Sequence, residues 1–257
     1  MLATLGQLPA GDSWAWEMKW DGAREISQVR AGACRFYSRN GNDITVSYPE
    51  LPDPLLAALD GRDAVLDGEI VALDQGRPSF ALLQRRMHVQ RVTPQLRTEV
   101  PVTLYLFCVL AVDGHSTTAL PYLERRSLLD DLVAPGPREQ VPPFWTDTTG
   151  EQMLALAREH HLEGVVAKRI GSPYQPGRRS PDWLKHPIRS NTEGIIVGWL
   201  PGSGTAAGGI GSLILAAYDD DHQLTYIAGS EQDSVHPSGG SCAHNSNRSN
   251  GRPARWR

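Results

Sequence analysis

The sequence lacks any apolar run approaching the roughly 18 residues that a membrane-spanning helix needs. Its first residues show no basic stretch followed by an apolar segment, so no export signal is expected. Cysteine is scarce, with Cys34, Cys108 and Cys242 in 257 residues and no two of them in a CxxC pair. These absences argue against a membrane protein, a disulfide scaffold and a structural zinc site, and they favour the reduced cytoplasm.

The chain also lacks an overall positive charge, because its formal net charge is −4. Taken alone, this balance argues against a nucleic-acid partner. Residues 168–189, however, carry six lysines and arginines against one acid, Asp182. Such a segment is commonly a solvated basic face. It becomes a phosphate-binding edge if the rest of the sequence carries phosphate chemistry.

Strands are predicted where apolar residues alternate or cluster between glycine and Asn-Gly turn signals. The nearly continuous apolar run at 102–112 is typical of a strand buried on both faces. The run at 64–73 is interrupted by Asp67-Gly68-Glu69, which is unusual for a purely structural strand. The predicted strands of the first 190 residues are 14–20, 25–29, 34–38, 64–73, 102–112 and 164–168.

Helices are predicted between these strands. Leucines at 55, 56 and 59 share a helical face that ends at Gly61, and residues 122–133 also have a helical pattern. Ser79 is predicted to cap a helix that bears Phe80, Leu82, Leu83 and Met87. Thr149 and Gln152 have the spacing of a capping box that starts a further helix. The interleaving favours an α+β or α/β domain over residues 1–190, and we adopt α+β.

The character of the chain changes near residue 191. Short strands are predicted at 194–200, 212–218 and 224–228, which suggests a small antiparallel β domain over residues 191–229. Residues 230–257 contain almost no apolar side chains, so they are predicted to form a disordered tail.

Lys19 lies between apolar neighbours, with Glu17, Asp21 and Arg24 close to it in sequence. A lysine amine acts as a nucleophile only when it is unprotonated. On a strand, residues 17, 19 and 21 would share one face. An ion-paired edge strand explains this segment at least as well as a catalytic site does.

Two further segments place a carboxylate beside a glycine at an apolar strand. These are Asp67-Gly68-Glu69 and Glu163-Gly164. A buried carboxylate is costly unless it is paired or binds a metal, and a neighbouring glycine lets a ligand approach the backbone. Two carboxylates on neighbouring strands suit Mg²⁺ with a nucleotide phosphate. A β-bulge or a turn is the structural alternative.

Together, and in this order, the segments resemble the motifs of the covalent nucleotidyltransferases. The chain is most similar to the ATP-dependent DNA ligases, in particular the ligase domain of bacterial end-joining repair enzymes, over residues 1–229. The matching residues are 19–22 and Arg24 for motif I, 38–41 for motif Ia, 67–69 for motif III, 105–107 for motif IIIa, 163–166 for motif IV and 183–185 for motif V.

The resemblance implies a nucleotidyltransferase (adenylation) domain at 1–190, with antiparallel sheets and flanking helices, followed by a partial OB-fold. It implies that ATP and Mg²⁺ or Mn²⁺ are bound and that Lys19 is the nucleophile that carries AMP. By the resemblance, Glu17 faces the adenine amine and Phe107 stacks on the base. Glu69 contacts the ribose or a metal, and Glu163 binds the metal. The basic residues contact phosphates: Arg24 and Arg39 those of nucleotide or DNA, Lys168 and Lys185 the α-phosphate, and Arg179 the departing phosphates.

The same resemblance implies three steps, in which lysine is adenylated, AMP passes to the 5′-phosphate of a DNA nick, and the 3′-hydroxyl displaces AMP. The implied partners are nicked or broken double-stranded DNA and end-joining repair proteins. The protein is expected to be a monomer in the bacterial cytoplasm, associated with the nucleoid and not with a membrane.

The chain departs from the family pattern at three places. Motif IIIa usually continues with aspartate, where this chain has Cys108, which buries well. Motif V commonly reads KxK, whereas here Lys185 is followed by His186 and Pro187, and Arg189 is the candidate to compensate. An OB barrel needs roughly 75–110 residues, so the one begun at residue 191 is expected to be incomplete. Full turnover is therefore in question.

Two alternatives stay open at this point. An RNA ligase or a GTP-using capping enzyme shares the KxDG motif and the strand order. A truncated DNA-binding fragment with little or no activity fits the incomplete OB-fold and the polar tail. Competition between ATP and GTP separates the first alternative, and nick binding without adenylation identifies the second.

Overall fold

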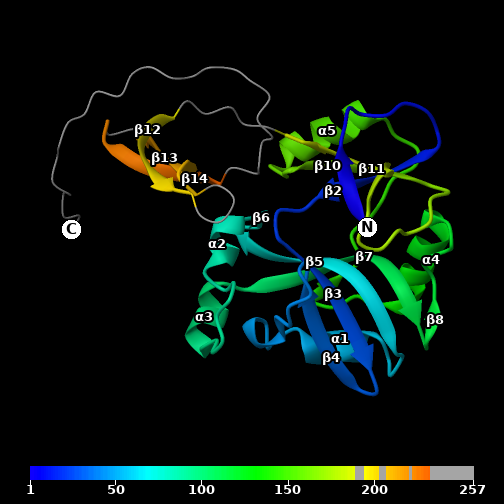
Figure 1. Ribbon diagram of the computed structural model, residues 1–257. Helices are drawn as coiled ribbons and strands as arrows, with labels where there is room; N and C mark the ends of the chain where they lie inside the picture. Colours follow the sequence, from blue (N-terminus) through cyan, green and yellow to red (C-terminus); the bar gives the residue numbers. More distant parts are fainter. Residues whose placement is uncertain (189–193, 203–206, 220–221, 232–257) are drawn as a thin grey trace. The chain divides into compact units, whose positions relative to one another are not determined.

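The computed structural model describes residues 1–188, 194–202, 207–219 and 222–231. The chain divides into two compact units, unit 1 at Met1–Arg189 and unit 2 at Ser190–Arg257. Unit 1 contains two β-sheets with helices packed on them (Figure 1). Among the described residues, no helix is long and apolar enough to cross a membrane.

The larger sheet of unit 1 holds the main hydrophobic core. Its strands are, in spatial order, β4 (Ala33–Ser38), β3 (Ala23–Arg30), β5 (Ala64–Asp74), β7 (Val102–Val112) and β8 (His115–Ser116), with β6 (Arg77–Pro78) paired to β5 and β9 (Glu139–Gln140) paired to β7. Apolar residues of these strands pack in one cluster with those of α1 (Pro52–Ala58) and α4 (Tyr122–Leu132). The 3₁₀ turn η1 (Thr45–Ser47) connects β4 to α1.

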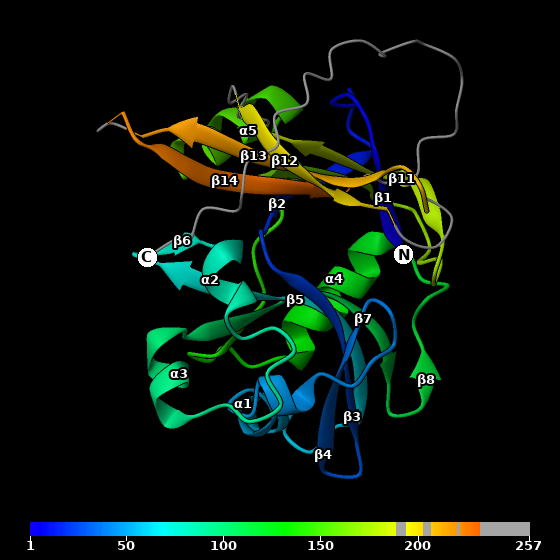
Figure 2. The same ribbon diagram turned by 60° about the vertical axis from the view of Figure 1, so that its left-hand side comes forward.

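The smaller sheet of unit 1 has the spatial order β1 (Leu2–Leu5), β11 (Arg179–Pro187), β10 (Gly164–Arg169) and β2 (Trp14–Lys19). Strand β10 is antiparallel to both of its neighbours, while β1 runs parallel to β11. The helix α5 (Gly150–Glu159) lies beside β10 and β2 (Figure 1; α5 and β2 also in Figure 2). Its apolar residues, such as Met153 and Ala157, pack in one cluster with those of the two strands. This sheet carries Lys19 at the end of β2, opposite Gly164 in register.

Side-chain caps begin three of the helices in unit 1. The Thr149–Gln152 capping box is present at the start of α5, which confirms the sequence prediction. Ser79 accepts from the amide of Leu82 and begins α2 (Phe80–Gln84), as predicted, but that helix ends before Met87. Thr93 caps α3 (Pro94–Glu99) in the same way, and this short helix was not predicted.

The described part of unit 2 is a three-stranded antiparallel sheet. Its strands are β12 (Ile195–Pro201), β13 (Ile210–Tyr218) and β14 (Leu224–Glu231), in that order. The three predicted strands are therefore confirmed. Strand β14 reaches Glu231, so the tail predicted to begin at residue 230 is wrong for its first two residues. Residues 232–257, with Cys242, lie outside the described residues.

The α+β class predicted from the sequence is confirmed, with two local differences. Asp67-Gly68-Glu69 does not interrupt β5, because the strand is continuous and the irregularity is a register shift against β7 between Asp67 and Gly68. This is the bulge that the sequence left open. Strand β2 ends at Lys19, so Asp21 lies beyond the strand and does not continue the face of Glu17 and Lys19.

Candidate active site

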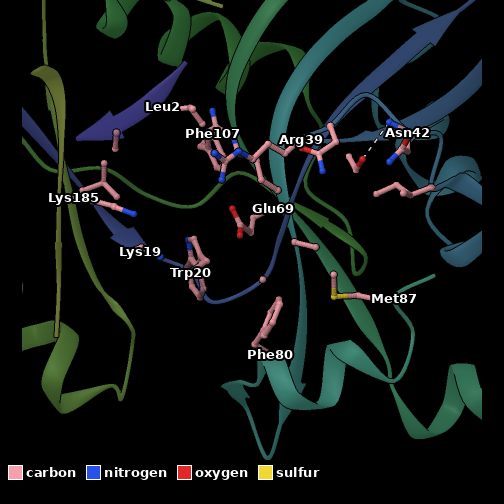
Figure 3. Close-up of a pocket in the computed structure, with 18 of the residues that line it drawn as sticks. Leu2, Lys19, Trp20, Arg39, Asn42, Glu69, Phe80, Met87, Phe107 and Lys185 are labelled. Carbon is pink, nitrogen blue, oxygen red and sulfur yellow. Dashed lines mark hydrogen bonds between the residues drawn. The ribbon is translucent and has the colours of Figure 1, made fainter. Parts of the chain in front are cut away.

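A pocket of about 840 Å³ lies between the two sheets of unit 1. Figure 3 shows Lys19 and Lys185 on one side of it, Glu69 and Phe107 in the middle, and Asn42 and Met87 on the other side. Its walls come from strands of both sheets and from the segments after β4 and α2. The site is therefore built from residues that are up to about 180 positions apart in the chain.

Lys19 forms an ion pair with Glu163, with its Nζ donating to Oε2. Both side chains keep partial access to solvent, at 21% and 33% exposure. Glycines fix the backbone on both sides of this pair. A Cβ on Gly164, which has φ +145°, would lie 2.3 Å from the carbonyl oxygen of His186, and one on Gly22 would lie 2.4 Å from that of Ile70. The KxDG and EG motifs are thus places where two backbones approach closely.

Lys168 and Glu17 form a second, buried ion pair at 2.6 Å between Nζ and Oε2. Tyr122 donates to the other carboxylate oxygen of Glu17 at 2.5 Å. The lysine ammonium also lies 4.3 Å from the ring centre of Trp183 and 4.7 Å from that of Phe107. Burial lowers the pKa of Lys168, and the charge of Glu17 opposes this effect.

Arg24 extends from β3 into the pocket and is held by Asp67 of β5. The guanidinium donates to both carboxylate oxygens, at 2.9 and 2.5 Å, while Tyr174 donates to the same carboxylate at 2.7 Å. Asp67 is fully buried, so its charge needs these donors. The arrangement fixes the guanidinium near Phe107, whose ring centre is 5.5 Å away.

Glu69 is the carboxylate of the pocket whose ionisation is most perturbed. Burial raises its pKa to about 7, with Arg24 and Lys19 opposing the rise. Burial and the charge of Glu163 also raise the pKa of Asp21. Three carboxylates therefore share the electrostatic environment of Lys19. A bound cation would relieve the repulsion among them.

The donor set fits a hydrated divalent cation that is bound together with a nucleotide. Mg²⁺ commonly takes one or two carboxylates and completes its shell with water and phosphate oxygens. Glu69 and Glu163 supply such oxygens beside Lys19. In the part of the chain that the structure describes, no group of three or more His, Cys, Asp or Glu side chains forms an all-protein metal cage.

The pocket also fits a purine nucleotide. Phe107 and Trp183 supply aromatic surface, and Arg24, Lys168 and Lys185 supply positive charge for phosphate. The indole Nε1 of Trp183 is buried and has no hydrogen-bond partner among the described residues, so it is a donor available to a bound group. Each carboxylate oxygen of Glu17 accepts from one protein group and retains a further lone pair.

The nucleotide-binding residues implied by the resemblance come together in this one pocket, although their individual roles stay predictions. Glu163 is not part of the pocket lining but contacts Lys19 directly. Cys108 is buried as expected, and its Sγ lies 2.7 Å from an Nη of the buried Arg125. The lining includes Glu17, Lys19, Arg24, Arg39, Glu69, Phe107, Lys168, Arg179 and Lys185.

Lysine occurs at only three positions in the sequence, Lys19, Lys168 and Lys185, against 22 arginines. All three lysines line the pocket. Apart from the histidines, basic side chains elsewhere in the chain are therefore arginines, which cannot be deprotonated in proteins. A side-chain amine is therefore present only at positions where phosphate chemistry is predicted.

The sequence did not identify several residues that hold the site together. Asp67 was noted only as part of a motif, and Tyr122 and Tyr174 were not noted at all. Their function depends on contacts across more than 100 positions, so no local pattern indicates them. Trp20 belongs to motif I and Tyr105 to motif IIIa, but their ring stacking, with centres 4.2 Å apart, was not predicted.

Replacing Glu69 by glutamine is expected to stabilise the protein at pH 8 and to have little effect at pH 5. A carboxyl whose pKa rises from 4.5 to about 7 on folding binds more protons in the folded state. Its contribution to stability therefore falls as the pH rises through this window. We expect a gain of about 2 kcal/mol at pH 8, after allowing for partial solvent access.

Denaturant unfolding of Glu69→Gln at the two pH values measures this difference. Asp43→Asn is the opposite-sign control, because hydrogen bonds from Thr45 lower the pKa of Asp43. That variant is expected to lose stability at pH 8. A gain for Glu69→Gln that does not grow with pH would contradict the assignment of a raised pKa.

Comparison with known proteins identifies the family. The ATP dependent DNA ligase domain matches residues 5–186. The chain is 38% identical over 218 residues to the multifunctional non-homologous end joining DNA repair protein LigD of Mycobacterium tuberculosis, covering 84% of this chain and 27% of that protein. It is 36% identical over 219 residues to DNA ligase 1 of Korarchaeum cryptofilum, covering 84% of this chain and 40% of the other.

Solved structures agree with this result. A mycobacterial DNA ligase D complexed with ATP and MES matches with a TM-score of 0.65 and 35% identity, over 90% of this chain and 71% of that one. The ligase domain of Mycobacterium tuberculosis LigD matches with a TM-score of 0.63 and 34% identity, over 91% and 72%. The present chain spans about a quarter of the length of the full LigD relative. The chain belongs to the family of ATP-dependent DNA ligase domains.

Proposed function

We propose that this chain is the adenylation core of an ATP-dependent DNA ligase and that Lys19 carries AMP. The observation that carries the proposal is the convergence of the chain's three lysines on one nucleotide-sized pocket, with Lys19 paired to Glu163. Within a family of ATP-dependent ligase domains, an amine in this position serves best as a nucleophile.

In the first step, the unprotonated amine of Lys19 attacks the α-phosphorus of ATP. A P–N bond forms, the bond from the α-phosphorus to the bridging oxygen of the β-phosphate breaks, and pyrophosphate leaves. The hydrogen bond from Lys19 Nζ to Glu163 supports this carboxylate as the group that receives the proton lost from the attacking nitrogen. Lys168, Lys185 and Arg179 offset the charge that develops on the phosphates.

Phe107 and Glu17 are proposed to contact the adenine. Arg24 and Arg39 are proposed to contact the phosphates of the nucleotide and of DNA. Glu69 and Glu163 are proposed to hold Mg²⁺ or Mn²⁺ together with phosphate oxygens. The ion would supply charge shielding and a template for the phosphates. Glu69 is proposed to contact the ribose when it does not bind the metal.

In the later steps, AMP passes from Lys19 to the 5′-phosphate at a nick, and the 3′-hydroxyl then displaces AMP as the phosphodiester forms. The relatives support DNA as the acceptor, because they are named as DNA ligases and end-joining repair proteins. Nicked or broken duplex DNA, end-joining partners and a monomeric state are part of the proposal. We also propose the division into an adenylation domain over residues 1–190 and a partial OB-fold over residues 191–229.

Incubation of the full chain with α-labelled ATP and Mg²⁺ or Mn²⁺ is expected to give label that survives denaturation. Addition of nicked duplex DNA should then move the label from protein to DNA. Excess unlabelled ATP should compete with labelling, whereas excess GTP should not. Competition by GTP would favour a capping-type enzyme. Absence of label with either metal, in a sample that still binds nicked DNA, would favour an inactive DNA-binding fragment.

A further inference from the structure

The pocket extends beyond the residues proposed to bind ATP. Its lining also includes polar residues from the segments after β4 and α2. We call Arg39, Asn40, Asn42, Asp43, His88 and Gln90 the polar arm. In the view of Figure 3, Asn42 and Met87, from these two segments, lie on the opposite side of Glu69 from Lys19. The arm is continuous with the pocket of Lys19, so a ligand in it can reach the proposed lysyl adenylate.

His88 and Gln90 belong to the segment between α2 and α3, which a buried arginine anchors. Arg86 is fully buried, and its guanidinium donates to both carboxylate oxygens of Glu50 at 2.8 and 2.9 Å. It also donates to the carbonyl oxygens of Ser47 at 2.7 Å and Val100 at 3.0 Å. Burial of this charge is compensated by the ion pair and the carbonyl acceptors.

The anchor fixes the backbone of the segment that follows it. Ser47 Oγ donates to the carbonyl oxygen of Val89 at 2.9 Å, and the amide of Val89 donates to the carbonyl oxygen of Arg86 at 3.2 Å. His88, between them, has φ +65°, in the left-handed region that non-glycine residues seldom adopt. Surrounding structure therefore imposes this conformation, which presents His88 and Gln90 to the pocket.

The chemistry of the polar arm suits a sugar–phosphate backbone. Two asparagines, a glutamine and a histidine supply neutral donors and acceptors, and Arg39 supplies one cation. The one carboxylate of the arm, Asp43, is paired with Arg35 at 3.7 Å. Protein contacts to nucleic-acid backbones commonly use arginine and the side-chain amides of asparagine and glutamine. The triphosphate tail of ATP requires more positive charge, and the three lysines supply it elsewhere in the pocket.

We infer that Arg86 is a positioning residue that fixes His88 and Gln90 as contacts for the sugar–phosphate backbone of the acceptor strand. This inference rests on the proposed function, because the acceptor strand must place its 5′-phosphate beside AMP on Lys19. The exposed His88 and Gln90 form the contacts, while Arg86 acts through the backbone that carries them. The ion pair with Glu50 keeps the anchor electrically neutral.

The test compares two steps in the same protein samples. The variant His88→Ala/Gln90→Ala is expected to reduce AMP transfer to nicked duplex DNA about tenfold more than it reduces lysine adenylation by ATP, through loss of two hydrogen bonds. Binding of nicked duplex should weaken in parallel. Gln84→Ala is the matched control, since Gln84 is exposed at the end of α2 and does not line the pocket. It should behave as wild type.

Arg86→Lys tests the positioning role, because lysine cannot reproduce the bidentate pairing to Glu50. Transfer is again expected to fall more than adenylation. If Arg86→Lys slows adenylation and AMP transfer equally and lowers the unfolding midpoint, Arg86 has only a structural role and the inference is overturned. Transfer as fast as wild type in labelled His88→Ala/Gln90→Ala, or slower adenylation alone, would contradict the inference but not the proposed function. A wild-type chain that takes no label would contradict both.

Discussion

Lys19→Ala is expected to abolish covalent labelling by ATP, with a rate loss of at least about a thousandfold. The amine is the atom that forms the P–N bond, so no neighbouring group replaces it. Lys168 is buried against Glu17 and three aromatic rings, which leaves its amine committed to protein contacts. The measurement is the amount of label that stays on the denatured protein after incubation with α-labelled ATP.

Lys19→Arg is the matched control for the loss of the ion pair. A guanidinium can still pair with Glu163 and preserve the charge balance, but it cannot be deprotonated and act as a nucleophile. We therefore expect Lys19→Arg to fold with a near wild-type unfolding midpoint and to take no label. Labelling of Lys19→Arg at the wild-type level would mean that the ion pair, and not the amine, is what the site requires.

Lys168→Met is expected to destabilise unit 1 by about 3 kcal/mol or more. The substitution leaves the buried carboxylate of Glu17 without its cation, and removal of one partner of a buried pair is typically far more costly than removal of both. Tyr122 still donates to Glu17, but a neutral hydroxyl offsets only part of the charge. Denaturant unfolding followed by tryptophan fluorescence measures the loss.

Two variants make this measurement specific. The double variant Glu17→Gln/Lys168→Met should recover a large part of the lost stability, since it removes the unpaired charge. Arg169→Met, one position along β10, breaks the exposed pair with Asp182 and should cost less than about 1 kcal/mol. If Lys168→Met and Arg169→Met have the same free energy of unfolding, the buried Glu17–Lys168 pair does not stabilise unit 1 more than the exposed Arg169–Asp182 pair does.

Local patterns in the sequence predicted much of unit 1. The strands over residues 14–20 and 102–112 were expected from apolar patterning. The second is present with the predicted bounds, and the first ends one residue earlier, at Lys19. The capping box at Thr149 was also expected, because its two hydrogen bonds join residues three apart. Signals of this kind depend only on neighbouring residues, so a single sequence contains them.

Pairings between distant segments were not predicted. Strand β1 pairs in parallel with β11, 177 positions away at Leu2 and Arg179, and neither segment was predicted as a strand. The hydrogen bonds that hold the site residues in place also join separate segments of the chain. Tyr174 reaches Asp67, and Arg86 reaches Ser47 and Val100. The motif resemblance identified residues that line the pocket but not the residues that hold them in place.

The same contrast holds for Asp67-Gly68-Glu69. The sequence showed that the segment is unusual, and the structure shows why. Asp67 turns into the interior to hold Arg24, whereas Glu69 faces the pocket and carries a pKa near 7. A register shift in the pairing with β7 occurs between Asp67 and Gly68, so it separates Asp67 from Glu69 along the strand. Spacing alone cannot distinguish a structural carboxylate from one that faces a ligand.

Mass spectrometry of peptides from the ATP-treated protein tests the central claim most directly. The chain has three lysines, so an AMP adduct has few candidate sites. We predict that AMP is found on Lys19, and that the adduct disappears when nicked duplex DNA is added. An adduct on Lys168 or Lys185, or no adduct in a folded sample that binds ATP and a divalent metal, would contradict the assignment of Lys19 as the nucleophile.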